Sequence, residues 1–169
     1  PSGGELRVRS LRANNEDVGL AVAGQRAALN LVSSKKVSAS MNRGDWVVSS
    51  AANFVVKRLD VRIQVLSTEG KPLANRTPVH LHLGAADVTG RVITFDRVGI
   101  APGNSSFAQL ILDEPIHAIC GDRFVLRDQA ASRTFAGGVV VEVFAKPYRA
   151  KYRDQRIAQL HAVSATAIE

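Results

Sequence analysis

Two histidines that alternate with apolar residues are the clearest candidates for chemistry in this sequence. His80 and His82 lie between Val79, Leu81 and Leu83. A strand that turns these apolar side chains inward would place both imidazoles on its outer face. There they could meet the phosphates of a nucleic acid or remain ordinary exposed polar groups. Two histidines at this spacing also suggest a metal, but with no carboxylate or other third ligand nearby we predict no metal site.

Arginines form the second set of candidates. The 22 Lys and Arg outnumber the 15 Asp and Glu, which gives a formal charge of +7. This charge favours an acidic partner, most commonly nucleic acid, because each cation placed against a phosphate releases condensed counterions. A basic protein without such a partner is the alternative. Arg123 and Arg127 share a face of one alternating segment, and Arg91 and Arg133 lie beside turn glycines. Each also suits a structural salt bridge.

Catalytic arrangements are not predicted. The spacing supports no Ser-His-Asp, Cys-His or paired-carboxylate site, and the phosphate-binding pattern Gly-x-x-x-x-Gly-Lys-Ser/Thr is missing, since Gly70-Lys71 is followed by Pro72. Cys120 is the only cysteine, which excludes an intrachain disulfide and fits a reducing, cytoplasmic compartment. No apolar run approaches the roughly 18 residues of a membrane span. We therefore expect a non-enzymatic, cytoplasmic chain with no membrane partner.

The elements that carry these residues are predicted to be strands. Short runs that alternate with a period of two, separated by turn residues, indicate an all-β barrel or sandwich. We expect strands at residues 6–11, 25–32, 45–48, 54–66, 77–83, 90–95, 107–112, 123–126 and 138–144. The small, polar residues 49–53 predict a linker between two β units. The aromatic residues in apolar strand positions are expected in the core: Trp46, Phe54, Phe95, Phe124 and Phe144.

The end of the sequence is the one part with helical character. Asp154 is expected to cap a short helix. Its apolar stripe would run through Ile157, Leu160, Ser164 and Ile168. A basic stretch precedes and enters this segment, with Lys146, Arg149, Lys151, Arg153 and Arg156. We interpret it as a solvated, partly flexible connector, with a nucleic-acid-binding arm as the alternative.

Several segments resemble a known family in the family's own order. Residues 8–12, the stretch Gly24-Gln25-Arg26-Ala27-Ala28-Leu29-Asn30 and residues 42–46 resemble the second half of β-barrel domain II of translational GTPases. The wording of that stretch is most similar to the selenocysteine-specific elongation factors. Later segments resemble domain III of the same factors. They are residues 77–82, 88–92, 108–112, 121–128 and 133–140.

The resemblance implies a specific architecture and role. It implies two small antiparallel β-barrel units, with residues 1–53 as the incomplete second half of domain II, 54–148 as domain III, and 149–169 as a basic linker that starts a helical region. The function implied is that of the tRNA-binding region of a factor that delivers selenocysteyl-tRNA to the ribosome during UGA recoding. A fragment of another translational GTPase, or a basic β-rich protein-interaction module, is the alternative.

The resemblance also implies partners and site residues. The parent protein would be a GTPase that uses GTP and Mg²⁺, while this part, without the GTPase domain, would need no cofactor. Its partners would be selenocysteyl-tRNA, the ribosome, the GTPase domain of the same chain and, through strand edges left open in the first unit, a second copy as a homodimer.

Arg26 matches the arginine of the family motif, so the resemblance makes it a candidate cation for the selenolate pocket, unless it is an ordinary surface residue. His80, His82, Arg91, Arg123, Arg127 and Arg133 are candidate tRNA contacts, since helical RNA is bound mainly through phosphates and 2′-hydroxyls.

Overall fold

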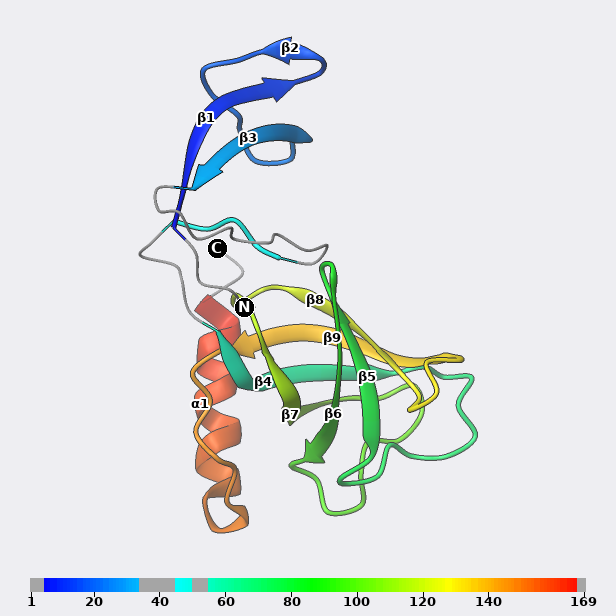
Figure 1. Ribbon diagram of the computed structural model, residues 1–169. Helices are drawn as coiled ribbons and strands as arrows, with labels where there is room; N and C mark the ends of the chain where they lie inside the picture. Colours follow the sequence, from blue (N-terminus) through cyan, green and yellow to red (C-terminus); the bar gives the residue numbers. More distant parts are fainter. Residues whose placement is uncertain (1–4, 34–44, 50–54, 167–169) are drawn as a thin grey trace. The chain divides into compact units, whose positions relative to one another are not determined.

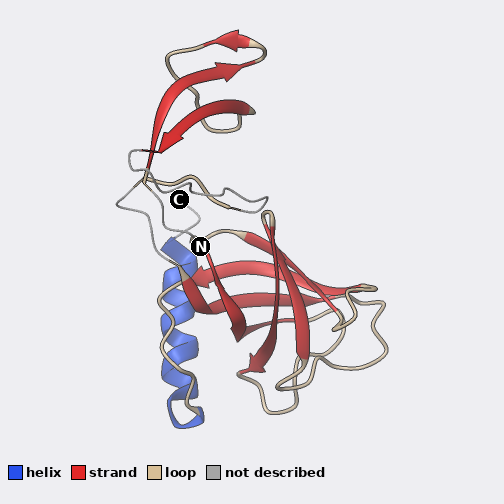
Figure 2. Ribbon diagram, viewed as in Figure 1, coloured by secondary structure: helices blue, strands red, loops and turns tan. Residues whose placement is uncertain are grey.

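The chain is divided into two compact β units. The computed structural model describes residues 5–33, 45–49 and 55–166 (Figure 1). One unit comprises residues 2–42 and 48–53, and the other comprises chiefly residues 43–47 and 54–169. Strands dominate both units, and one α-helix follows the last strand (Figure 2). Among the described residues, no helix is long and apolar enough to cross a membrane.

The smaller unit is a three-stranded antiparallel sheet. Its strands are β1 (Leu6–Ala13), β2 (Glu16–Asp17) and β3 (Ala27–Ser33), in the spatial order β2-β1-β3. Asn14 and Asn15 form the β1–β2 turn with positive φ angles of 53° and 66°, a conformation that asparagine tolerates better than most residues. Large apolar side chains such as Val8 and Leu29 remain exposed on this sheet. The expectation of an incomplete first unit is confirmed.

The larger unit is a closed antiparallel barrel. Its strands are β4 (Val56–Val65), β5 (Pro78–Leu83), β6 (Ala86–Thr94), β7 (Ser105–Ile116), β8 (Arg123–Arg127) and β9 (Thr134–Glu142). They close in the order β4-β7-β6-β5-β8-β9, which pairs every edge of the sheet. Alternating apolar side chains fill the interior, among them Leu59, Val61, Leu81, Leu110 and Leu126. The predicted all-β fold class is confirmed.

The C-terminal helix α1 (Arg153–Thr166) follows a 3₁₀ turn at Ala150–Tyr152. Leu160 is fully buried in a second apolar cluster with Phe95, Phe107 and Val141, and Ile157 packs against that cluster. The predicted helix is therefore present and docked on the barrel. Asp154 lies within its first turn, one residue after the helix begins, and Ile168 lies outside the described residues.

Two expectations about local structure are wrong. Residues 45–49 form no strand. The side chain of Trp46 instead packs on the barrel cluster and stacks on His117, with 6.4 Å between ring centroids. Phe144 is not in the core, because it follows the end of β9 and is 67% exposed. Phe95 and Phe124 are buried as expected, and Phe54 lies outside the described residues.

Candidate functional site

The outer surface of three adjacent barrel strands gathers most of the predicted site residues. Strands β6, β5 and β8 are neighbours, and their outward positions follow from the alternation of buried and exposed residues. We call this surface the β6–β5–β8 face. Its charged and polar members are His80, His82, Asp87, Thr89, Arg91, Arg123 and Arg127. Five of the six predicted tRNA contacts thus share one surface.

The expectation that no carboxylate lies near the two histidines is wrong, because Asp87 is hydrogen-bonded to His80 and lies close to His82. His82 and Asp87 are directly opposite each other in the β5–β6 hairpin. Asp87 Oδ1 lies 3.0 Å from His80 Nδ1 and 3.9 Å from His82 Nε2. The hydrogen bond from His80 and the nearby positive charge hold the pKa of Asp87 below its usual value. Asp87 is therefore ionised at neutral pH.

The arginines of the face are spaced along its length. Arg127 is opposite His80 across the β5–β8 pair, and Arg91 is opposite Pro78 on β6. Arg123 begins β8, and its side chain and that of Arg91 are exposed. Three guanidinium groups against one carboxylate leave this face positive, which suits the phosphates of a helical nucleic acid.

Arg133 does not join the face. It lies in the β8–β9 loop, where its Nη1 donates to Glu69 Oε1, and its backbone N–H donates to Asp128 Oδ1 at 3.2 Å. The hydrogen bond to Glu69 raises the pKa of the Arg133 guanidinium above its usual value. Hydrogen bonds from the Ser132 hydroxyl and then from the Arg133 backbone N–H lower the pKa of Asp128. Arg133 therefore has the structural salt bridge that the sequence analysis left open for each arginine.

Arg26 is exposed and directly precedes β3. The turn before it is closed by Gln25, whose side chain accepts a hydrogen bond from the Val22 N–H at 2.9 Å, and Gly24 has the positive φ of 86° that this turn requires. Arg26 lines a surface hollow with Arg12, Asn14 and Asn15. Arg12 is held by Asp17 at 3.0 Å, whereas Arg26 has no hydrogen bond to another described residue.

A further polar cluster, missed by the sequence analysis, fixes α1 on the barrel. Asp60, Gln109 and Glu142 are neighbours across β7, β4 and β9. Arg156 of α1 donates to Asp60 Oδ2 and, at 2.8 Å, to Glu142 Oε2. Gln109 donates to Asp60 at 2.6 Å. Burial raises the pKa of Asp60, although these hydrogen bonds oppose the shift.

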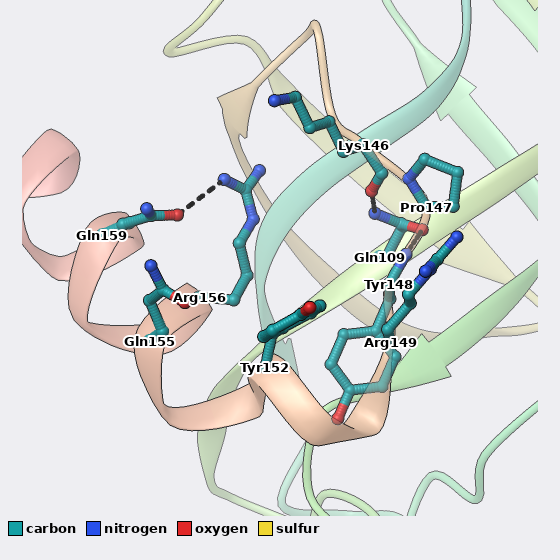
Figure 3. A pocket seen from close by; sticks show the side chains of 9 residues that line it. All are labelled: Gln109, Lys146, Pro147, Tyr148, Arg149, Tyr152, Gln155, Arg156 and Gln159. Carbon is teal, nitrogen blue, oxygen red and sulfur yellow. Dashed lines mark hydrogen bonds between the residues drawn. The ribbon is translucent and has the colours of Figure 1, made fainter.

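This cluster borders a surface hollow between α1 and the segment that follows β9 (Figure 3). Within α1, Arg156 donates to Gln159 Oε1 at 3.4 Å, and Gln109 of β7 donates to the Lys146 carbonyl at 2.8 Å. The interpretation of the basic stretch as a solvated connector is therefore wrong for Arg156. Arg153 also helps to hold α1 on the barrel, since its Nε donates to the Phe95 carbonyl at 2.6 Å.

Comparison with known proteins finds one family consistently. The β-barrel domain of selenocysteine-specific elongation factors matches residues 60–147. The selenocysteine-specific elongation factor of Escherichia coli (strain K12) is 33% identical over 159 residues, which are 94% of this chain and 24% of that protein. The factor of Desulfomicrobium baculatum is 29% identical over 154 residues, which are 91% of this chain and 24% of that protein.

Solved structures agree on the fold. The translation elongation factor SelB from Methanococcus maripaludis, in its apo form, has a TM-score of 0.65 with 24% identity, over 84% of this chain and 34% of that one. A bacterial selenocysteine-specific elongation factor, EF-Sec, has a TM-score of 0.68 with 22% identity, over 92% of this chain and 24% of that one. The chain spans about a quarter of the length of the curated relatives it matches.

Proposed function

We propose, from the premise that this chain belongs to the selenocysteine-specific elongation factor family, that it is the part of such a factor that holds selenocysteyl-tRNA. The whole protein would be a cytoplasmic GTPase that uses GTP and Mg²⁺ and delivers this tRNA to the ribosome. The observation that supports the tRNA-binding role is the β6–β5–β8 face of a family-matched barrel, where Arg91 on β6 and Arg123 and Arg127 on β8 lie on the two strands that flank β5.

The charge on this face predicts how RNA binding responds to salt. Replacing Arg91, Arg123 and Arg127 together with glutamine should weaken binding of the chain to tRNA. It should also reduce the slope of log affinity against log salt concentration by about 2–3, because each lost phosphate contact removes roughly one released counterion. Fluorescence anisotropy with labelled tRNA at several salt concentrations measures both quantities.

A matched variant separates the position of the charges from their number. Lys71, Arg97 and Lys151 are exposed and lie outside the face, so their joint replacement with glutamine removes the same charge elsewhere. This control should retain most of the salt slope. Equal losses in the two triple variants would contradict a defined binding face and favour non-specific attraction to a basic protein. Salt-independent binding, or none, would favour the alternative of a protein-interaction module.

Arg26 is proposed to supply positive charge to the pocket for the selenocysteine side chain. Its exposed guanidinium at the hollow beside Asn14 and Asn15 supports this role, because a fixed cation favours a selenolate over a neutral hydroxyl. In the full-length factor, Arg26→Ala should weaken binding of selenocysteyl-tRNA by about 1–3 kcal/mol, the scale of a lost charge-assisted contact. Binding of seryl-tRNA, measured at the same salt concentration, should be nearly unchanged.

Two further variants sharpen that measurement. Arg26→Lys should recover part of the preference, since the charge survives while the planar fork of donors does not. Arg9→Ala, which removes another exposed arginine from the same small sheet, should leave the preference for selenocysteyl-tRNA unchanged. Equal losses for the two tRNAs in Arg26→Ala would remove Arg26 from the pocket, leaving the surface position that the sequence analysis held open.

A further inference from the structure

The β5–β6 hairpin carries a cluster of side chains of the types that bind metal ions, next to the arginines of the β6–β5–β8 face. His82 and Asp87 are cross-strand partners, and His80 lies two residues before His82 on the same side of β5. The two-residue connection at Gly84 and Ala85 fixes this register, since Leu83 pairs with Ala86. Both imidazoles and the carboxylate therefore occupy adjacent outward positions on a rigid hairpin.

The atoms of this cluster are spaced as metal ligands are. One ligand atom from each of His80, His82 and Asp87 lies within 4.8 Å of the other two. The separations from Asp87 Oδ1 are 3.0 Å to His80 Nδ1 and 3.9 Å to His82 Nε2. Tetrahedral ligands at about 2.0–2.1 Å from a zinc ion lie roughly 3.3–3.4 Å from one another. Small side-chain rotations would bring all three to that separation.

The hydrogen bonding of the cluster is incomplete without an additional partner. His82 Nε2 is shielded from solvent and has no hydrogen-bond partner among the described residues, which is costly for a polar atom. The Asp87 carboxylate lies 3.9 Å from this nitrogen, so a cation placed between them would interact with both groups. His80 can join them as a ligand by moving its ring hydrogen from Nδ1 to Nε2.

We propose that His80 Nδ1, His82 Nε2 and the Asp87 carboxylate form a binding site for a single divalent transition-metal ion of the zinc type. Two imidazoles and one carboxylate favour Zn²⁺, Co²⁺ or Ni²⁺ over Mg²⁺ and Ca²⁺, which prefer oxygen ligands. With three protein ligands, at least one coordination position is left for water. The Arg127 guanidinium on the adjacent strand opposes the added charge, so this is a moderate-affinity site.

Metal binding is tested directly on the chain, without RNA, so its outcome does not depend on the proposed function. Zinc chloride is titrated calorimetrically into tag-free protein carrying Cys120→Ser, which removes the exposed thiol as a competing ligand. One ion per chain is expected. Asp87→Asn and His82→Gln should each lower the affinity by about tenfold or more, because each removes one of the three ligands.

The control and a second readout make the result decisive. His117 lies outside the cluster and stacks on Trp46, so His117→Gln should bind zinc as the parent does. Zinc should raise the melting temperature of the parent and of His117→Gln, and have a smaller effect on Asp87→Asn, since a ligand stabilises the state that binds it. Melting curves without metal also show that each variant is folded. Failure of the parent to bind zinc, or equal affinity in folded Asp87→Asn, would overturn the proposal.

Discussion

Replacing Arg156 with alanine is expected to lower the free energy of unfolding of the barrel by about 3 kcal/mol, because it leaves a buried carboxylate without its cation. Asp60 is fully buried beneath α1, and the Arg156 side chain is 20% exposed. The remaining exposure places the effect at the low end of what breaking a buried ion pair costs. Urea denaturation followed by tryptophan fluorescence measures it, since Trp46 packs on the barrel core.

The same variant should show a characteristic dependence on pH. Burial raises the pKa of Asp60 above its usual value of 3.8, while the Gln109 and Arg156 hydrogen bonds act against that shift. A raised pKa in the folded state means that Asp60 contributes most to stability below pH 3.8 and loses that contribution as the pH rises through its folded pKa. Loss of Arg156 raises this pKa further, since the hydrogen bond and the positive charge of Arg156 both lower it, and Glu142 then repels the carboxylate without an intervening cation.

The stability difference between the parent and Arg156→Ala should therefore be small at and below pH 3.8, where Asp60 is protonated in both folded proteins, and should widen as the pH rises through the folded pKa of Asp60 in the parent. It should level off once Asp60 is ionised in both proteins. Denaturation curves at a series of pH values give this profile directly. A difference that does not change with pH would mean that the loss of stability comes from weaker packing of α1 and not from the unpaired charge on Asp60.

Two other variants identify the cause of the destabilisation. The double variant Asp60→Asn with Arg156→Met replaces both charges, so it should be more stable than Arg156→Ala alone. Arg123→Ala removes an exposed arginine from β8 and should change the free energy of unfolding by no more than about 0.5 kcal/mol. A double variant as unstable as the single one would show that the docking of α1 depends on the ion pair itself.

The fold could be predicted from the sequence because strand alternation is a local signal. In β5 the apolar residues Val79, Leu81 and Leu83 are buried, and His80 and His82 face outward, as their alternation predicts. The same reasoning correctly placed Phe124 and Leu126 opposite Arg123 and Arg127. Residues 45–48 show where it fails, since they alternate in the same way but form no strand, and Trp46 packs on the barrel cluster instead.

The interaction partner of a polar side chain could be predicted only where the two residues are close in the sequence. Asp87 follows His82 by five residues across a tight hairpin, so a two-residue turn at Gly84 and Ala85 would have revealed the histidine–carboxylate cluster. Asp60 and Arg156 are 96 residues apart. Asp60 alternates with Leu59 and Val61 in the same way as Arg58 and Arg62 do, so its sequence context does not indicate burial. Only the docking of α1 covers it and supplies its partner.

A methyl group at position 138 is expected to destabilise the barrel by on the order of 3 kcal/mol or more, because it would meet backbone that cannot move. Gly138 lies in β9 opposite Ile63 of β4 and Phe124 of β8. A Cβ atom there would lie 2.0 Å from the Arg62 carbonyl oxygen and 2.7 Å from the Phe124 ring. The ring can turn aside, but the carbonyl belongs to the strand that closes the barrel.

The destabilisation by Gly138→Ala should come from steric overlap of the new Cβ and not from backbone conformation. Alanine variants at two other glycines, Gly137 and Gly70, test that distinction. Gly138 does not have a positive φ, so alanine can adopt its backbone angles. At Gly137 the closest contact of a new Cβ is 3.0 Å, to the Phe124 carbonyl oxygen, and at Gly70 there is nothing within 4 Å.

Urea denaturation should therefore rank the alanine variants from least to most stable as Gly138→Ala, Gly137→Ala and Gly70→Ala, with Gly70→Ala at or slightly above the parent. Equal stability of the 138 and 70 variants would mean that β4 and β9 separate without loss, and that closure of the barrel at this seam contributes little to its stability.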